Sequence, residues 1–436
     1  MLPAYYLHAC KLVNSNQTLL FTLPSCASIL MPEESYAAFK SGKIPVESAR
    51  QLARAGFLVE DHDSEKANVF GLIDKLNRIN STVRVSVILN LVCNFACKYC
   101  YEGSQKGEHR MDQPTADLLI ELLKERFSPS HKNKMILDLY GGEPLLSVPM
   151  IKYLASKLKP WAEEQNGIFE FTLVTNASLL NRETVEELKE YGLRSARVTI
   201  DGPPETHNSY RPFKNGRGSY DLIVKNLLEV CDLIKVSLGG NFTETNFRKF
   251  TELLDDLLAK GLTPDRLQLV KFSQVTKTND EFSPKFNEGC CSIDEPWLAE
   301  AFLFLREEIL KRGYRTSKPT PNICMAEAED SFVVHYDGSI YKCPGLIGVE
   351  RFKVGNLKDG LEDYRETYAL DNWRNEEKCR ECTYLPLCFG GCRYARYQRT
   401  GEMEGVECMQ NHYNKTLEAM LLQELKYRRK PGEAAG

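Results

Sequence analysis

The sequence lacks an excess of charge of one sign, a long hydrophobic run and an export signal. Its 56 basic and 60 acidic residues leave a formal net charge of −4, so it shows no basic footprint for nucleic acid or a membrane surface. No apolar run is long enough to span a bilayer. Residues 1–30 lack the basic start, apolar core and small-residue cleavage site of a signal peptide. We therefore expect a cytoplasmic protein with no nucleic-acid or membrane partner.

The rest of the composition is that of a globular protein, apart from its cysteines. With 436 residues, 42% apolar and 27% charged, the chain is long enough for two or three domains. Fifteen cysteines are an odd number in a long chain without an export signal, which argues against a disulfide framework. Ten of them fall into two groups, and this spacing indicates metal ligation in a reducing compartment.

The first group is Cys93, Cys97 and Cys100, separated by three and then two residues. A [4Fe–4S] cluster has four iron corners that take thiolate ligands. Three thiolates on one loop leave one iron open, and an open iron can bind a substrate or cofactor. A zinc site is the alternative, but structural zinc usually takes four protein ligands, and a fourth is missing nearby.

This spacing, with the aromatic Tyr99 just before the last cysteine, resembles the cluster loop of the radical S-adenosylmethionine (SAM) enzymes. The resemblance implies that the three cysteines are catalytic and that the open iron chelates the amino and carboxylate groups of SAM. It also implies reductive cleavage of SAM to a 5′-deoxyadenosyl radical that abstracts hydrogen from the substrate. An external reductant such as a flavodoxin or ferredoxin would supply the electron.

Residues 81–315 alternate between short β-prone runs and amphipathic helical patterns, which predicts an α/β fold with a parallel sheet. The expected strands are Val83–Leu91, Met135–Tyr140, Phe169–Thr175, Ala196–Ile200, Val236–Asn241 and Leu267–Phe272. The expected helices are Pro114–Phe127, Val148–Gln165, Arg182–Tyr191, Tyr220–Leu233, Phe247–Lys260 and Trp297–Arg312. Six units resemble the partial (β/α)6 TIM barrel of the radical SAM core, in which chemistry lies at the carboxyl ends of the strands.

The glycine, charged and polar residues that could bind a ligand follow the carboxyl ends of the predicted strands. The run Gly141-Gly142-Glu143-Pro144 resembles the family's GGEP motif, in which Glu143 would accept a hydrogen bond from the SAM amino group. By the same resemblance, Thr199 and Arg211 would contact SAM, and the guanidinium would bind its carboxylate. The resemblance also assigns Tyr99, Asn176 and Asn241 to the cofactor, Tyr99 through its backbone. Asp201 and His207 are either part of the site or loop-capping residues.

The second group lies in residues 316–420 and resembles the SPASM extension of radical SAM maturases in every spacing. Its seven cysteines are Cys324, Cys343, Cys379, Cys382, Cys388, Cys392 and Cys408. The resemblance implies two auxiliary [4Fe–4S] clusters, one held by Cys324, Cys343 and Cys392 and the other by the remaining four. The fourth ligand of the first cluster is Cys290, Cys291 or an open position. Residues 421–436 are expected to be a frayed tail.

Residues 1–80 are expected to form three strands, Tyr5–Val13, Thr18–Leu23 and Ala27–Met31, followed by helices at Glu33–Lys40, Pro45–Ala55 and Glu65–Ile79. This order resembles the small winged-helix-like module with which peptide-modifying enzymes bind a leader peptide by strand addition. An N-terminal cap without a ligand is the alternative.

The leading interpretation is a maturase that forms a thioether or carbon–carbon cross-link in a ribosomally made precursor peptide. A second interpretation is an anaerobic sulfatase-maturating enzyme that oxidises Cys or Ser to formylglycine. In that subfamily an aspartate follows the hairpin cysteine, whereas here Pro344 and Gly345 follow Cys343. Two further functions stay open: a small-molecule radical SAM dehydrogenase, and a non-enzymatic iron–sulfur electron carrier or leader-binding protein.

Overall fold

The computed structural model describes residues 1–13, 15–128, 131–277, 286, 288–290 and 292–427. Its centre is a ten-stranded sheet with the order β11-β10-β9-β8-β7-β6-β12-β13-β14-β15. The first six of these are parallel neighbours. They are β6 (Thr82–Ile88), β7 (Lys134–Tyr140), β8 (Ile168–Thr175), β9 (Leu193–Thr199), β10 (Lys235–Phe242) and β11 (Leu269–Gln274). The prediction of a partial (β/α)6 barrel is confirmed.

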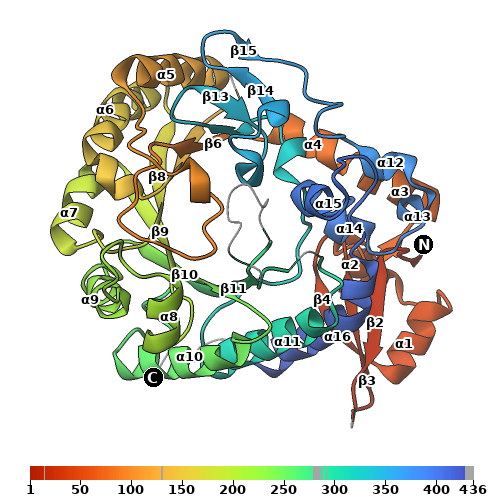
Figure 1. Ribbon diagram of the computed structural model, residues 1–436. Coiled ribbons are helices and arrows are strands. Elements are labelled where there is room, and N and C mark those ends of the chain that lie inside the picture. The colour runs from red at the N-terminus through yellow and green to blue at the C-terminus, as the bar shows by residue number, and fades with distance from the viewer. Residues whose placement is uncertain (14, 129–130, 278–285, 287, 291, 428–436) are drawn as a thin grey trace.

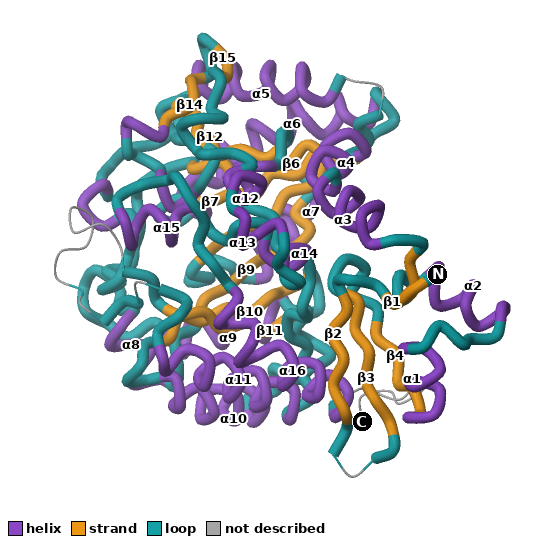
Figure 2. Tube along the Cα trace, turned by 90° about the vertical axis from the view of Figure 1, so that its right-hand side faces the viewer, coloured by secondary structure: helices purple, strands orange, loops and turns teal. Residues whose placement is uncertain are grey.

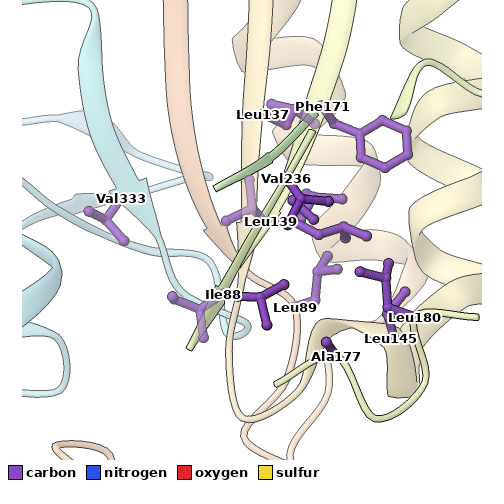
Figure 3. Packing of buried hydrophobic residues seen from close by; sticks show 14 of the residues in the cluster. Ile88, Leu89, Leu137, Leu139, Leu145, Phe171, Ala177, Leu180, Val236 and Val333 are labelled. Atoms are coloured by element: carbon purple, nitrogen blue, oxygen red, sulfur yellow. The ribbon is translucent and has the colours of Figure 1, made fainter. Parts of the chain in front are cut away.

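Helices cover the outer face of this sheet (Figure 1). They are α5 (Gln113–Phe127), α6 (Val148–Glu164), α7 (Arg182–Glu190), α8 (Pro204–Tyr210), α9 (Tyr220–Val230), α10 (Phe250–Ala259) and α11 (Pro296–Lys311). Buried and partly exposed side chains alternate strictly along β7, because successive residues of a strand point to opposite faces. Leu137 and Leu139 of β7, Phe171 of β8 and Val236 of β10 therefore meet in the core between sheet and helices (Figure 3), while the other face lines the barrel lumen.

The C-terminal part extends the barrel sheet rather than forming a separate one. β12 (Ser331–Val334) pairs in parallel with β6, and β13 (Ser339–Tyr341), β14 (Lys353–Asn356) and β15 (Gly360–Leu361) follow as antiparallel neighbours. Gly338 lies in the turn between β12 and β13. This attachment places Cys343, directly after β13, beside the mouth of the barrel.

Four short helices and one long helix complete the C-terminal part. The short helices are α12 (Asn372–Asn375), α13 (Glu377–Arg380), α14 (Leu385–Cys388) and α15 (Arg393–Thr400), and the long helix is α16 (Gln410–Lys426). The expectation of a frayed tail from residue 421 is wrong for residues 421–426. These residues continue α16, Leu421 is buried, and Arg306 of α11 pairs with Glu424. None of the described helices is long and apolar enough to cross a membrane.

The N-terminal part contains an antiparallel sheet, β2-β3-β4, and a small pair, β1-β5. The strands are β1 (Leu2–Pro3), β2 (Leu7–Lys11), β3 (Gln17–Thr22), β4 (Ser28–Pro32) and β5 (Leu58–Val59), and the helices are α1 (Glu33–Lys40), α2 (Val46–Arg54), α3 (His62–Phe70) and α4 (Leu72–Ile79). The expected single helix Glu65–Ile79 is divided at Gly71, which has the poorest helix propensity after proline.

The β2-β3-β4 sheet stands beside the C-terminal helices (Figure 2). Tyr6, Phe21 and Ile73 from this part share one buried cluster with Trp373 and Leu417 from the C-terminal part. Chain ends far apart in sequence therefore build one apolar core outside the barrel.

Candidate active site

The cysteine loop after β6 is held from two sides by backbone hydrogen bonds. Ala96 N donates to Pro212 O at 2.9 Å, and Lys98 N donates to Tyr210 O at 3.0 Å. On the other side, Gly142 N donates to Asn90 O at 2.9 Å. The loop that carries Arg211 and the loop after β7 are thereby fixed against the three cysteines.

Gly141 and Gly142 permit this close approach. A Cβ atom on either residue would lie 2.3 Å from a backbone carbonyl oxygen, that of Asn90 or that of Val92, and Gly141 has a φ of +137° that favours glycine. The glycine pair thus allows the loop after β7 to contact the segment that follows β6.

These loops surround a cavity of about 440 Å³. Nearly all of the predicted cofactor and cluster residues line it. They are Cys93, Cys97, Cys100, Tyr99, Gly141, Gly142, Asn176, Thr199, Arg211 and Asn241. Residues from the C-terminal part, Pro344, Gly345 and Tyr394, line the same cavity. Strand ends, cysteine loop and C-terminal hairpin therefore converge on one space, as expected for the carboxyl end of a barrel.

The three thiols of the cysteine loop line one cavity together. Among the described residues, no three His, Cys, Asp or Glu side chains are arranged to hold one metal ion. Thiols spread around a cavity suit the corners of a larger iron–sulfur group. Burial raises the pKa of all three thiols, and Lys106 acts in the opposite direction.

Glu143 lies behind the cavity and is not among its lining residues. It is fully buried and accepts hydrogen bonds from Leu145 N (3.1 Å), the Thr175 hydroxyl (2.7 Å) and Asn176 N (2.8 Å). Burial raises the pKa of its carboxyl, and these donors oppose that shift. The carboxylate thereby joins the loops after β7 and β8. The expected role of Glu143 as an acceptor for the SAM amino group stays a prediction. Pro144 also lies outside the lining.

The Tyr99 hydroxyl also has a role that the sequence did not predict. It donates to the Asp201 carboxylate and accepts from Arg211 Nη1 at 2.8 Å and Asn241 Nδ2 at 3.0 Å. Arg211 Nε is buried without a hydrogen-bond partner among the described residues. An unpaired guanidinium nitrogen beside the cavity suits a carboxylate ligand.

Asn176, Asp201 and His207 make hydrogen bonds within and between the loops around the cavity. Asn176 donates to Asn94 at 2.8 Å and accepts from Ser178, which joins the end of β8 to the cysteine loop. His207 accepts a hydrogen bond from Asp201 N at 3.1 Å, and both residues are fully buried. The loop-capping alternative for Asp201 and His207 therefore agrees with their positions.

Sequence reasoning missed several lining residues, namely Glu102, Lys106, Tyr140, Arg197, Gln274 and Tyr394. The charge of Arg197 inside a predicted strand was an available signal, because a barrel strand alternates between core and lumen. Glu102 and Lys106 follow the cysteines in a loop without a regular pattern. Burial raises the pKa of Glu102 to about 7.

The C-terminal cysteines lie in two places, and their division between two clusters stays a prediction. Cys379, Cys382, Cys388 and Cys408 line one small cavity. Cys324 and Cys392 lie close enough to Cys343 to raise the pKa of its thiol, although burial has the larger effect. The Cys290 thiol donates to the backbone carbonyl of Ser292. Cys291 lies outside the described residues, so a fourth ligand for the three-cysteine group stays a prediction.

Comparison with known proteins agrees with this geometry. The model of the Radical SAM superfamily matches residues 87–257. A Cysteine-type anaerobic sulfatase-maturating enzyme of Clostridium novyi is 22% identical over 69% of this chain and 85% of its own length.

Two solved structures share the fold. One, native anSMEcpe with bound AdoMet and Kp18Cys peptide, has a TM-score of 0.62 and 18% identity over 79% of this chain and 98% of its own. The other, Streptococcus suis SuiB bound to precursor peptide SuiA, has a TM-score of 0.54 and 15% identity over 93% of this chain and 98% of its own. Residues 87–257 therefore form a radical SAM domain, and the chain has the fold of radical SAM enzymes with a SPASM extension, so we describe it as a SAM-dependent iron–sulfur enzyme.

Proposed function

We propose that this enzyme is a maturase that forms a cross-link in a ribosomally made precursor peptide. The observation that carries the proposal is the single cavity shared by the cysteine loop, the strand ends and the C-terminal residues Pro344, Gly345 and Tyr394. A peptide that enters this cavity would lie between a SAM-binding cluster and the SPASM part. The similarity to SuiB, whose structure holds a precursor peptide, supports a peptide substrate.

Cys93, Cys97 and Cys100 would hold the SAM-binding [4Fe–4S] cluster. When bound, this cluster and SAM supply the radical that abstracts a hydrogen atom from the substrate. The backbone of Gly141 and Gly142 would form one wall of the SAM site. Arg211 would bind the SAM carboxylate through the nitrogen that is unpaired among the described residues, with Asn176, Thr199 and Asn241 as further polar contacts.

The two C-terminal groups would hold auxiliary clusters. The donor set fits: four cysteines line the cavity of Cys379, Cys382, Cys388 and Cys408, and a [4Fe–4S] cluster takes four thiolates. The group of Cys324, Cys343 and Cys392 lies nearer the active site, because Pro344 and Gly345 line that cavity. An external reductant such as a flavodoxin or ferredoxin would deliver electrons.

The N-terminal part would hold the leader of the precursor. Its β2-β3-β4 sheet has β2 and β4 at the edges, and an edge strand offers unpaired backbone groups to an added strand. The shared core of Tyr6, Phe21 and Trp373 would then keep the leader site at a fixed position relative to the barrel.

Sulfatase maturation is the second candidate, and it is favoured by the TM-score of 0.62 with anSMEcpe and by the 22% identical Clostridium novyi enzyme. Against it stands the loop after Cys343. Pro344 and Gly345 line the cavity where that activity requires a base, and neither side chain can take up a proton. The two candidates differ in product, because a cross-link removes a pair of hydrogen atoms whereas formylglycine made from cysteine loses sulfur.

The test has two stages, both anaerobic. Iron content and EPR spectra of the reconstituted enzyme are compared with those of a Cys93/Cys97/Cys100→Ala variant. We expect about four irons fewer, and SAM should perturb only the signal that the variant lacks. A Cys10/Cys26/Cys231→Ala variant, altered at cysteines outside the three groups, is the matched control. Unchanged iron in the first variant, or zinc in its place, contradicts the cluster assignment.

In the second stage, short peptides encoded beside the gene are incubated with enzyme, SAM and reductant and analysed by mass spectrometry. A peptide that loses a pair of hydrogen atoms and gains a new linkage supports the maturase. Conversion of a sulfatase-type peptide to formylglycine selects the second candidate instead. SAM cleavage without a change in any peptide contradicts both.

A further inference from the structure

One cation of the active-site cavity has no role in the assignments above. Arg197 lies on β9, two residues before Thr199, and lines the cavity. Its neighbours Ala196 and Val198 are buried in the core between sheet and helices. Alternation along the strand therefore directs Arg197 into the barrel lumen, below the proposed SAM contact.

The two residues that flank Arg197 on the adjacent strands are neutral and small. In the sheet register, Val174 of β8 and Ser237 of β10 flank it. One step further along β10, Gly239 has no side chain, and a Cβ atom there would meet nothing closer than 3.6 Å. The lumen is therefore open beside the Arg197 guanidinium.

The acidic residues on the lumen face of the adjacent strand β8 and of β7, the next strand along, already have partners. Asp138 accepts two hydrogen bonds from Arg84, at 2.6 and 2.9 Å. Glu170 pairs with Lys134 at 2.9 Å and with Arg194 at 2.5 Å. No hydrogen bond or ion pair to Arg197 is found among the described residues, so no described carboxylate compensates its charge.

The other cavity cations differ from Arg197. Arg211 lies 4.0 Å from Asp201 and bonds to Tyr99, and Lys106 faces the thiols of Cys100, Cys93 and Cys97. Glu102 is the one carboxyl group among the described lining residues. An unpaired guanidinium in a partly enclosed space binds a carboxylate with two parallel hydrogen bonds when one is offered.

We propose that Arg197 binds a carboxylate of the peptide segment that enters the cavity. The substrate class is then a peptide with an acidic side chain, or a free C-terminus, at the modified position. This inference rests on the proposed peptide maturase. It adds a specificity-determining residue that acts on the substrate and not on SAM.

The experiment uses the SAM-bound, fully reconstituted enzyme and three small probes in anaerobic calorimetric titrations. N-acetylglutamate N-methylamide carries a side-chain carboxylate, N-acetylglutamine carries a main-chain carboxylate, and N-acetylglutamine N-methylamide is neutral. We expect one carboxylate probe to bind the wild-type enzyme about tenfold more tightly than the neutral probe. Which of the two binds identifies the source of the carboxylate.

Arg197→Met should abolish this preference, and Arg197→Lys should retain part of it. Lys235→Met is the matched control, because Lys235 is an exposed cation on β10 at the opposite end of the barrel and its loss changes the net charge equally. Equal binding of all probes to the wild-type enzyme, or a preference that persists in Arg197→Met, overturns the inference.

SAM binding and 5′-deoxyadenosine formation, measured in the same samples, separate this inference from the proposed function. If Arg197→Met weakens SAM binding as much as probe binding, Arg197 belongs to the SAM site and the inference is wrong. If the wild-type enzyme does not cleave SAM at all, the proposed function fails, whatever the probes show.

Discussion

Replacement of Tyr99 by phenylalanine removes a single oxygen atom from the centre of the polar network beside the cavity. That oxygen donates to Asp201 and accepts from Arg211 at 2.8 Å and from Asn241 at 3.0 Å. After the substitution, Asp201 keeps its hydrogen bond from Asn241 N at 2.7 Å, but Arg211 loses its hydrogen-bond acceptor. A buried hydrogen bond to a charged group contributes about 1.5–3 kcal/mol. Two such bonds are lost, one to Asp201 and one to Arg211.

Part of the lost hydrogen-bond energy lowers the stability of the loops. The rest allows the Arg211 side chain to leave the orientation that it has in the structure. If half of one bond energy, about 1 kcal/mol, is expressed in the orientation of Arg211, SAM should bind roughly fivefold more weakly. The assay is anaerobic equilibrium dialysis with labelled SAM, accompanied by thermal unfolding of the same samples. We expect weaker binding together with a lower unfolding midpoint.

Tyr101→Phe is a matched control two residues away. The Tyr101 hydroxyl is buried beside Tyr140, and among the described residues it makes no hydrogen bond to Arg211, Asp201 or Asn241. Its removal should therefore leave SAM affinity within about twofold of wild type, since Arg211 keeps its hydrogen-bond acceptor. Equal effects of the two substitutions, or undiminished SAM affinity in Tyr99→Phe, would refute the role of the Tyr99 oxygen in positioning Arg211.

Three further predictions concern the loops and the C-terminal part. Gly142→Ala should lower iron content and SAM binding because its Cβ would lie 2.3 Å from Val92 O, whereas Gly71→Ala, with 3.5 Å to its nearest atom, should change neither. Arg393→Met should destabilise the protein by about 3–5 kcal/mol, since it leaves buried Glu327 unpaired. Removal of an exposed pair by Arg182→Met should cost less than about 1 kcal/mol in the same thermal unfolding assay. Glu65→Ala removes the acceptor for Tyr5 N at 2.7 Å and should lower the unfolding midpoint, with no change in iron content.

The barrel was predictable because its signals are local. Apolar runs of strand length alternate with amphipathic helices, and the cysteines follow the first strand directly. The positions of Glu143 and Tyr99 were not predictable in the same way. Their partners Asn176, Asp201 and Asn241 come from three other strand ends, and a sequence does not state which polar groups will face a cavity and which will fill the space behind it.

The pairing of the C-terminal strands with the barrel sheet could not be predicted from the sequence either, for a different reason. The β12–β13 hairpin joins residues that are close in sequence, but the pairing of β12 with β6 joins distant ones and could not be predicted. Ser331 pairs with Arg84, although more than two hundred residues separate them in the sequence. Neither strand has a sequence pattern that indicates which strand it pairs with. Yet this pairing is what brings Cys343, Pro344 and Gly345 to the barrel mouth.

The shared apolar core of the two chain ends has a consequence for how the parts cooperate. Trp373 is fully buried against Phe70 and Phe389, at ring distances of 5.6 and 5.5 Å, and Cys379 of the four-cysteine group lies in the same cluster. Disorder in the N-terminal part would therefore expose apolar surface next to a proposed metal site. Because that surface is buried only when both parts are folded, occupation of the four-cysteine site and order in the N-terminal sheet should stabilise each other. Loss of the metal should then weaken the binding of a peptide to the N-terminal sheet.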